Sequence, residues 1–366
     1  MNRPPRVLQV LLSLHPGGTE RLVLELASRL HAELPTAVCC LDERGAWAST
    51  LEDNGIRVTA LGRRPGFQPS LGTRIAALVK QHGATVVHAH HYSPFVYSAV
   101  ARLQHPGTRL IFTEHGRLSD APPSGKRRIA NQLLGLIPHR IFAVSDNLRQ
   151  HMIGEGFRRD SVDVIYNGID IGPRPTPAQR GAVRARLGVS DDAFVIGTVA
   201  RLDPVKDLGT LLQAVATVAS GCDPRVVVIG DGPERASLER VAAALGVTSR
   251  LTLLGHRDDA RGWLAGCDVY ANSSISEGVS LTILEGMAAV LPVVATRVGG
   301  TPEVIDETCG WLAPARNPGA LAEALLECAR DRPQASARGE AARRRVEARF
   351  TLDRMISEYR DTYLGD

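Results

Sequence analysis

The sequence predicts an α/β fold of two similar domains that enclose a cleft, each domain built on a parallel sheet with helices on both faces. Short apolar runs alternate with amphipathic stretches, which is the pattern of strands connected by helices. The alternation pauses at a proline-rich segment after residue 170 and then starts again. The length of 366 residues, with 44% apolar residues, also favours two domains, at roughly 150 residues per domain.

Six apolar runs in the first half of the chain are expected to be strands. Each precedes or follows a helical pattern; in residues 21–30, for example, Leu22, Leu26 and Leu30 fall on one face of a helix. Ligands of open parallel sheets bind beyond the carboxyl ends of the strands, so the residues that follow these runs are the candidates for function. The runs are Val7 to Leu14, Ala37 to Leu41, Val58 to Leu61, Thr85 to His88, Leu110 to Thr113 and Arg140 to Val144.

The boundary between the domains is expected near residue 170. A seventh run, Asp163 to Tyr166, is followed by residues 172–179, which contain three prolines and read as a linker. We therefore predict domains over residues 1–170 and 171–350, and a last helix over residues 351–366 that packs back toward the first domain. Strands of the second domain are expected at Phe194 to Val199, Arg225 to Ile229, Leu251 to Leu254, Asp268 to Ala271 and Pro292 to Ala295.

The segment from Ser274 to Ala288 carries the strongest chemical signal. Glu277 lies in a loop of small residues, and Ser280 or Thr282 can cap the helix that follows. The free N–H groups and the positive dipole end of this helix favour a phosphate, while Glu277 and Glu285 can accept hydrogen bonds from hydroxyls. This combination suits a sugar nucleotide. The alternative is a capping box of Thr282 and Glu285, with Glu277 merely exposed.

Two further loops follow predicted strands. In the first, Gly17 and Gly18 permit close backbone approach to an anion, or they form a plain tight turn. In the second, Arg201 and Lys206 are placed to reach the phosphates of a nucleotide, or they are solvated surface groups. Cations held there would stabilise the charge that grows on a departing diphosphate.

Four histidines also follow strands. His88, His90 and His91 come after one strand, and His115 comes after the next. A metal site is conceivable, but an obvious third ligand is missing, and hydrogen-bonded structural histidines are more common at such positions. His115 is expected to face the cleft opposite Glu277, as a group that contacts substrate or transfers a proton. A structural role for His115 is the alternative.

Composition narrows the class of protein. The six cysteines show no Cys-x-x-Cys spacing, which favours reduced, buried thiols in the cytoplasm, and no run of 18 apolar residues occurs. The first 170 residues contain 20 Lys and Arg against 14 Asp and Glu, without the interleaved aromatics of a nucleic-acid site. The excess forms either a solvated face or a contact with anionic lipid headgroups. It gathers in Arg117, Lys126, Arg127, Arg128, Arg140, Arg149, Arg158 and Arg159.

Taken together, these residues resemble family 4 of the retaining glycosyltransferases. The resemblance spans nearly the whole chain and rests on the order of several motifs at strand ends. It implies the GT-B fold, in which two Rossmann-like doubly wound domains face each other across a cleft, the first on the acceptor side and the second binding the nucleotide sugar. The motifs are GGTE, HAHH, FTEHG, VSDNL, NGID, VARLDPVKD, GDGPE, the pair Glu277 and Glu285, and VGGTPEVI.

The resemblance also implies roles for single residues. Arg201 and Lys206 would bind the donor diphosphate, Glu277 the sugar hydroxyls and Glu285 the ribose, while His115 would line the reaction centre. Catalytic roles are thus implied for His115, Glu277, Arg201 and Lys206. Donor binding is implied for Gly17, Gly18, Arg201, Lys206, Glu277, Gly278, Val279, Ser280, Leu281, Thr282 and Glu285.

The implied reaction moves a hexosyl unit from a UDP- or GDP-sugar, with retention, to a hydroxyl of a lipid-linked or cell-surface glycan, as in exopolysaccharide biosynthesis. No metal or other cofactor is implied, since Arg201 and Lys206 can replace a divalent cation, and the sequence contains no Asp-x-Asp triplet. The protein is expected in the cytoplasm or at the inner face of the plasma membrane. The alternatives are a nucleotide-sugar epimerase of the same fold and a non-catalytic nucleotide-sugar-binding protein.

Overall fold

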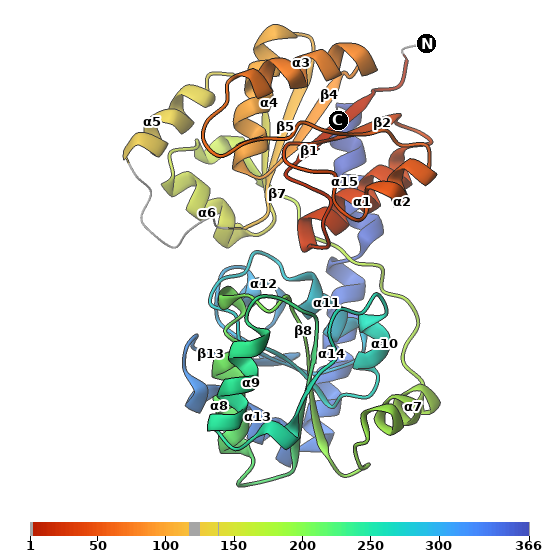
Figure 1. The fold of residues 1–366 in the computed structure, drawn as a ribbon, viewed down its shortest axis with the longest axis vertical. Coiled ribbons are helices and arrows are strands. Elements are labelled where there is room, and N and C mark those ends of the chain that lie inside the picture. The colour runs from red at the N-terminus through yellow and green to blue at the C-terminus, as the bar shows by residue number, and fades with distance from the viewer. Residues whose placement is uncertain (1–2, 117–124, 138, 366) are drawn as a thin grey trace. The chain divides into compact units, whose positions relative to one another are not determined.

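The computed structural model describes residues 3–116, 125–137 and 139–365, and the chain divides into two compact units. Unit 1 comprises Met1–Asn167 together with Asp353–Asp366, and unit 2 comprises Gly168–Leu352. The C-terminal segment, drawn in blue in Figure 1, therefore belongs to the same unit as the N-terminus. The two units are described separately below.

Unit 1 is built on a parallel sheet of seven strands in the order β3-β2-β1-β4-β5-β6-β7. The order reverses between β1 and β4, and ligands of doubly wound sheets bind beside such a switch point. The residues after β1 and β4 are therefore in the position where function is expected. The strands are β1 (Val7–Leu11), β2 (Thr36–Cys40), β3 (Val58–Ala60), β4 (Val86–His90), β5 (Arg109–Glu114), β6 (Arg140–Ala143) and β7 (Val162–Val164).

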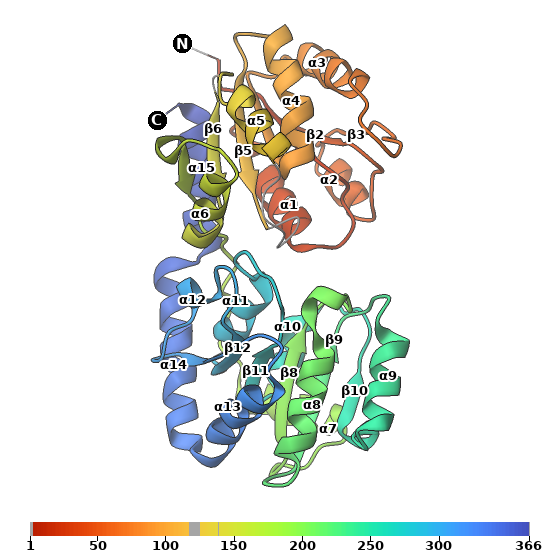
Figure 2. The same cartoon turned by 90° about the vertical axis from the view of Figure 1, so that its left-hand side faces the viewer.

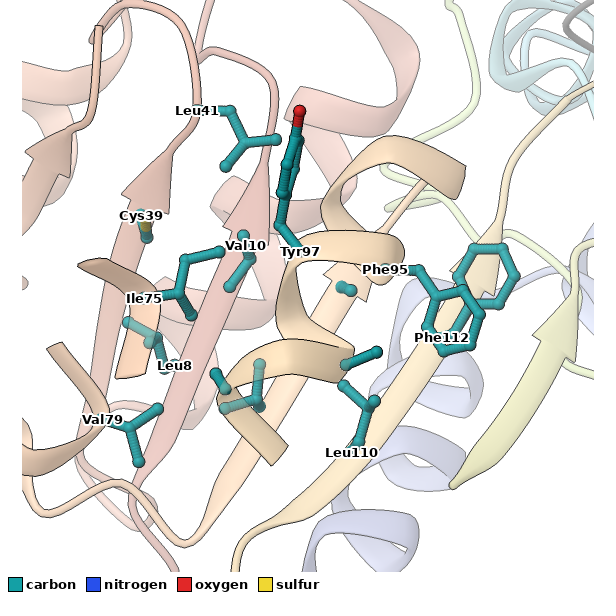
Figure 3. Packing of buried hydrophobic residues seen from close by; sticks show 14 of the residues in the cluster. Leu8, Val10, Cys39, Leu41, Ile75, Val79, Phe95, Tyr97, Leu110 and Phe112 are labelled. Atoms are coloured by element: carbon teal, nitrogen blue, oxygen red, sulfur yellow. The ribbon is translucent and has the colours of Figure 1, made fainter. Parts of the chain in front are cut away.

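Helices cover both faces of the unit 1 sheet. Side chains of α3, α4 and α6 share one core with Leu8 and Val10 of β1, whereas side chains of α1 and α2 share another core with Leu11. Within the first core, the rings of Phe95 and Phe112 stack with centroids 4.3 Å apart (Figure 3). The helices are α1 (Gly18–Leu30), α2 (Ala48–Asp53), α3 (Ser70–His82), α4 (Tyr92–Gln104), α5 (Gly125–Leu134), α6 (Asp146–Gly154) and α15 (Leu352–Leu364).

Unit 2 repeats the same architecture with six parallel strands in the order β10-β9-β8-β11-β12-β13 (Figure 2). Its switch point lies between β8 and β11, so the loops after these two strands meet at one edge of the sheet. The strands are β8 (Phe194–Val199), β9 (Pro224–Ile229), β10 (Leu251–Leu253), β11 (Val269–Asn272), β12 (Val293–Thr296) and β13 (Gly310–Ala313).

The helices of unit 2 flank this sheet, and the longest is α14. They are α7 (Pro177–Leu187), α8 (Leu208–Val218), α9 (Arg235–Ala244), α10 (Ala260–Leu264), α11 (Leu281–Ala288), α12 (Thr301–Val304), α13 (Pro318–Arg330) and α14 (Arg332–Arg349). Three short 3-10 turns occur as well: η1 (Arg159–Ser161) in unit 1, and η2 (Pro204–Lys206) and η3 (Thr248–Arg250) in unit 2.

Two local expectations were wrong. The first strand ends at Leu11 rather than Leu14, because the backbone N–H of Leu14 donates to the carbonyl of Arg44 in a loop; Leu14 is apolar because it is buried there. The proline-rich linker is shorter than expected, because Thr176 caps α7 in a capping box with Gln179 and Pro177 is the first helical residue.

The structure also shows the state of the cysteines and whether any described helix could span a membrane. All six cysteines are free thiols, and five of them are buried. Burial raises the pKa of Cys40, Cys267 and Cys328 to about 12. Within the described ranges, no helix combines the length and the apolar content that a membrane span requires.

Candidate functional site

The segment that follows β11 forms a loop and then α11, as expected. Ser280 occupies the N-cap position, but no side chain caps the helix. The alternative of a capping box formed by Thr282 and Glu285 is wrong, because Thr282 lies inside the helix and its hydroxyl accepts a hydrogen bond from Tyr270 Oη at 2.8 Å. The first-turn N–H groups of α11 therefore keep their capacity to bind an anion.

Glu277 is held in this loop by three donors. Its side chain is only 8% exposed, and its Oε1 accepts from Lys206 Nζ at 2.7 Å, from Ser274 Oγ at 2.6 Å and from Asn272 Nδ2 at 3.2 Å. All three donors meet the same oxygen, so Oε2 is the atom that stays available to a hydroxyl. A carboxylate fixed this firmly is a suitable acceptor for a sugar.

Lys206 reaches Glu277 because the loops after β8 and β11 lie next to each other. The residue ends the 3-10 turn η2, and its carbonyl accepts a hydrogen bond from Ser273 Oγ at 2.9 Å. One ammonium proton is directed to Glu277, and the other two remain for further acceptors. A pair of this kind places a cation and a hydroxyl acceptor side by side.

Arg201 lies in the same loop as Lys206 but takes no part in the pair. Its side chain is 69% exposed, and its guanidinium contacts Asp203 with Nε 3.2 Å from Oδ2. Among the described residues it has no contact with Glu277 or Lys206. The structure thus brings Lys206 and Glu277 together and leaves Arg201 as a long, exposed side chain in the same loop.

The remaining donor-binding candidates of unit 2 are arranged along α11. Glu285 lies in its second turn and is partly exposed. The segment VGGTPEVI packs on the Glu277 loop, since the N–H of Gly300 donates to the carbonyl of Gly278 at 3.1 Å. The others, Gly278, Val279, Ser280, Leu281 and Thr282, connect Glu277 to the first turn of the helix.

Three residues of this site were given no individual role by the sequence reasoning, although Ser274 begins the segment singled out there and Gly299 lies in the motif VGGTPEVI. Asn272 and Ser274 both donate to Glu277, and Gly299 has no room for a side chain, because an added Cβ would lie 1.7 Å from the carbonyl oxygen of Glu277. Asn272 and Ser274 are polar residues at the end of a buried strand, the same signal that pointed to Glu277.

In unit 1, the Gly17-Gly18 loop follows β1 directly. Gly17 is the N-cap of α1 without a side-chain cap, and Gly18 is the first helical residue; both are exposed. Thr19, one residue further on, contacts the ring of His91, with its Oγ1 2.9 Å from Nε2. The first turn of α1 is thus connected to the end of β4, beside the switch point of the sheet.

His91 has a constrained geometry. Its φ is 71°, a value that non-glycine residues rarely adopt, and its Nδ1 lies 3.0 Å from Glu114 Oε1. Burial acts to lower the pKa of His91, but the hydrogen bond and the charge of Glu114 outweigh it, so the pKa is raised. His91 and Glu114 therefore form a hydrogen-bonded pair next to His115, whose backbone N–H also donates to Glu114 at 3.1 Å.

His115 lies at the end of a buried hydrogen-bond network. Its Nε2 is 3.0 Å from His90 Nδ1, and His90 Nε2 is 2.8 Å from Gln9 Oε1. The amide of Gln9 donates to Tyr363 Oη at 3.0 Å, and that hydroxyl lies 2.6 Å from His88 Nδ1. The network crosses the sheet from β5 through β4 and β1 to the C-terminal helix α15.

The direction of the bonds follows from their chemistry. The amide oxygen of Gln9 only accepts, so Nε2 of His90 carries a proton. Burial lowers the pKa of His90 and His115 well below the ordinary value, so both rings are neutral. Nδ1 of His90 then accepts from Nε2 of His115. This leaves Nδ1 of His115 as an acceptor, and it has no partner among the described residues.

The histidines do not gather into a metal site in the part of the chain that the structure describes. No group of three or more His, Cys, Asp or Glu side chains there is placed to hold a metal ion. His88 instead bonds to Tyr363 and Thr113, with its Nε2 2.8 Å from Thr113 Oγ1. Tyr359 extends the network, with its hydroxyl 3.1 Å from the same Thr113 oxygen.

Comparisons with known proteins identify similar families and structures. A family model described as Glycosyltransferase Family 4 matches residues 16–172, and one described as Glycosyl transferases group 1 matches residues 193–331. The chain is 25% identical to the N-acetyl-alpha-D-glucosaminyl L-malate synthase of Bacillus anthracis over 307 residues, covering 82% of this chain and 79% of the relative.

Two more relatives cover nearly the full length. The GDP-mannose-dependent alpha-(1-6)-phosphatidylinositol monomannoside mannosyltransferase of Mycobacterium tuberculosis is 25% identical over 99% of this chain and 98% of its own. The crystal structure of Anabaena HepE in complex with UDP is 26% identical, covers 99% of this chain and 100% of that one, and superposes with a TM-score of 0.87. With the two parallel sheets described above, these similarities confirm the predicted fold class.

Proposed function

Because this chain belongs to glycosyltransferase family 4, we propose that it moves a hexosyl unit from a UDP- or GDP-sugar to a hydroxyl of a glycan acceptor, with retention at the anomeric carbon. One observation carries the proposal: Lys206 and Glu277 form a partly buried pair beside the uncapped N-terminus of α11. A cation, a hydroxyl acceptor and a set of free N–H groups are the three elements that a nucleotide sugar requires.

In the proposed donor complex, the diphosphate binds Lys206, Arg201 and the first-turn amides of α11. Oε2 of Glu277 accepts from sugar hydroxyls, and Glu285 accepts from the ribose. As the sugar leaves, negative charge grows on the diphosphate, and the two cations stabilise that charge more in the transition state than in the ground state. The two cations supply what a divalent cation would otherwise supply, so we propose a metal-independent reaction without other cofactors.

The proposed chemistry needs no carboxylate pair around the bond that breaks. The acceptor hydroxyl enters on the face from which the diphosphate leaves, and an oxygen of the diphosphate takes its proton. In unit 1, His115 offers Nδ1 to a sugar hydroxyl, and the Gly17-Gly18 loop offers backbone N–H groups to the diphosphate. This assigns His115, Glu277, Arg201 and Lys206 to the reaction.

The names of similar proteins support the donor and acceptor classes. HepE was solved with UDP, and the mycobacterial relative is named for GDP-mannose and a phosphatidylinositol mannoside. We therefore propose a lipid-linked or cell-surface glycan as the acceptor, with a place in exopolysaccharide biosynthesis, and a location in the cytoplasm or at the inner face of the plasma membrane.

The test is a thermal-shift and turnover screen with UDP- and GDP-sugars in the presence of a chelator. We expect one donor to raise the melting temperature and to be hydrolysed slowly without acceptor. Glu277→Ala is expected to abolish both effects. Glu327→Ala, which alters an exposed glutamate on α13 of the same unit, is the control and should leave them unchanged.

The same screen separates the alternatives. An epimerase would convert the donor into a second nucleotide sugar without any acceptor, and NMR of the nucleotide-sugar pool would detect that product. A non-catalytic binding protein would give the thermal shift but no turnover with any acceptor. If no nucleotide sugar changes the melting temperature, the proposed function is wrong.

A further inference from the structure

Phe67 is an exposed aromatic side chain between β3 and α3 of unit 1. It is 70% exposed, and it is the one aromatic among the strongly exposed large hydrophobic residues in the part of the chain that the structure describes. One side of its ring lies against Tyr97, with the ring centroids 5.6 Å apart and the planes 11° from parallel. Because Tyr97 belongs to the buried core, the ring of Phe67 is supported on one side and open on the other.

The loop that carries Phe67 is fixed at both ends. At its start, the guanidinium of Arg63 donates to both carboxylate oxygens of Asp42, at 2.6 and 3.0 Å. At its end, the backbone N–H of Gln68 donates to Tyr97 Oη at 3.1 Å. These bonds hold the chain on either side of the ring, so the exposure of Phe67 is a built-in feature of the loop.

This loop lies at the edge of the sheet where function is expected. It follows β3, and the carboxyl ends of parallel strands meet at one edge, so the loop shares that edge with the Gly17-Gly18 loop and His115. In Figure 3 the ring of Tyr97 lies at the same end of the sheet as Leu41, the residue that follows β2. Two strand spacings, about 10 Å, separate β3 from β1. Phe67 is therefore on the edge that carries the proposed reaction centre, but to one side of it.

The surroundings of Phe67 indicate what kind of group covers the ring. Apart from two prolines, its near neighbours in the loop are Arg64, Gly66 and Gln68, and no other strongly exposed large hydrophobic residue of the described chain lies there. Arg64 is exposed, and none of the described acidic side chains pairs with it. A protein partner or a bilayer would require a wider apolar patch.

A sugar requires less apolar surface. The C–H groups on one side of a pyranose ring carry partial positive charge and pack against the negative face of a single aromatic ring, while the hydroxyls at the edge of the sugar bind polar side chains. Phe67 supplies the aromatic face, and Arg64 supplies hydrogen-bond donors beside it. The loop therefore has the composition of a carbohydrate contact.

We propose that Phe67 is a stacking platform for a sugar ring of the glycan acceptor, with Arg64 donating hydrogen bonds to the hydroxyls of that sugar. Since Phe67 lies to one side of the reaction centre, the sugar that it binds is further along the glycan than the sugar whose hydroxyl reacts. An acceptor of several sugars is then bound more tightly than a single sugar. The inference rests on the proposed function, because it assigns one part of the acceptor site of the same reaction.

The experiment compares Phe67→Leu with Phe67→Trp in transfer from the best donor of the screen. The acceptors are the methyl glycosides of glucose, galactose, mannose and N-acetylglucosamine and the matching trisaccharides. Phe67→Leu keeps an apolar side chain but has no aromatic face, so we expect the KM for the preferred trisaccharide to rise about tenfold while kcat stays the same. The KM for the monosaccharide should not change. Phe67→Trp keeps an aromatic face and should retain the KM of the parent protein.

Two controls separate this effect from general damage. Leu103→Ala removes another exposed apolar side chain of unit 1, since Leu103 is 63% exposed on α4, and it should leave every KM unchanged. Melting temperature, donor binding and slow donor hydrolysis without acceptor are measured for each variant. All three should match the parent protein, because Phe67 takes no part in the proposed donor site.

Several results would overturn the proposal. These are a trisaccharide KM that Phe67→Leu leaves unchanged, an equal rise for monosaccharide and trisaccharide, or a Phe67→Trp variant as weak as Phe67→Leu. The fluorescence of Phe67→Trp, compared with that of the parent protein, gives a readout without any donor, and no response to any of the glycans would also contradict the platform. A response to a trisaccharide in a protein that binds no nucleotide sugar would support the platform and count against the proposed function alone.

Discussion

The ammonium of Lys206 lies 2.7 Å from Oε1 of Glu277, although the two residues are 71 positions apart in the chain. Parallel strands bring them together, because β8 and β11 are neighbours at the switch point of the unit 2 sheet. The pair fixes a carboxylate for a sugar and a cation for a phosphate in one place.

Removing the cation should damage both stability and activity. Lys206→Ala leaves Glu277 with two neutral donors and a desolvated charge, so we expect the protein to lose about 2 kcal/mol of stability. Transfer should fall about 10²-fold. In denaturant unfolding, Lys206→Ala/Glu277→Ala should be less destabilised than the sum of the single variants. Lys80→Ala on the surface of α3 is the control. Strict additivity of the two site variants would show that the pair is not coupled.

The close packing of Gly299 against the Glu277 loop leads to a second prediction. Gly299 has a φ of 51°, and an added Cβ would meet the carbonyl of Glu277, so Gly299→Ala must displace the Glu277 loop. We expect donor affinity to fall by about tenfold or more, because the carboxylate and the α11 amides lose their alignment.

Gly246→Ala is the matched control for Gly299→Ala. Gly246 also has a left-handed φ, 69°, but nothing lies within 4 Å of an added Cβ. Its expected cost is about 1 kcal/mol of backbone strain, without any effect on the donor. Calorimetric titration with the donor measures both variants, and equal donor affinity in the two would contradict the packing argument.

The hydrogen-bond network predicts the tautomer of His115. Because Nε2 of His115 donates to His90, the proton should be on Nε2 and not on Nδ1. Long-range ¹H–¹⁵N NMR spectra at neutral pH distinguish the two tautomers. Tyr363→Phe removes both the acceptor for Gln9 and the donor to His88, so the His115 signals should shift or broaden. Tyr359→Phe removes a hydroxyl that contacts Thr113 and makes no bond to Gln9, His90 or His115, so it should leave the His115 signals unchanged. A proton on Nδ1 in the parent protein would reverse the inferred direction of the network.

Because several histidines are buried, we expect the folding stability of the protein to depend on pH. Burial lowers the pKa of His88, His90 and His115 well below 6.5, so the unfolded chain binds more protons than the folded one below that pH. Their contribution to stability is therefore complete above pH 6.5 and is lost as the pH falls below it. The raised pKa of His91 acts in the opposite sense, because its contribution is lost as the pH rises through that value.

Three lowered pKa values against one raised value should give a net loss of stability on acidification. Melting temperatures between about pH 7.5 and 5 test this prediction. His88→Asn should make the decline shallower, whereas His256→Asn, which changes an exposed side chain of unit 2, should not. A melting temperature that is independent of pH over this range would contradict the argument.

The sequence predicted the fold class well because the strands of a parallel sheet are buried on both faces and read as continuous apolar runs. It also located Glu277, Lys206 and His115 at strand ends. The Lys206–Glu277 contact was beyond prediction, since spacing along the chain does not say which strands are neighbours after a crossover. The alternative of a capping box at Thr282 fails for a similar reason, because Tyr270 of β11 donates a hydrogen bond to that hydroxyl.

Helix α5 shows a different limit of sequence reasoning. Its basic residues were noticed, but periodicity gives only the angle between polar and apolar faces, not which face turns inward. The inward side of α5 is held by Asn131, whose partners Tyr92 and Glu155 lie 39 and 24 positions away in the chain, and by Leu134, which packs against the core of unit 1. Such contacts follow from tertiary structure alone.

The most direct test of the central claim is donor turnover by Glu277→Gln, measured as nucleotide diphosphate released from the best donor of the screen in chelator. The substitution keeps the size of the side chain but removes the negative charge that pairs with Lys206. It also replaces one carboxylate oxygen with an amide nitrogen, so the side chain accepts fewer hydrogen bonds from the donor. We predict that turnover falls about 10²-fold or more while the fold is retained. Turnover equal to that of the parent protein would show that Glu277 does not hold the donor and would contradict the account.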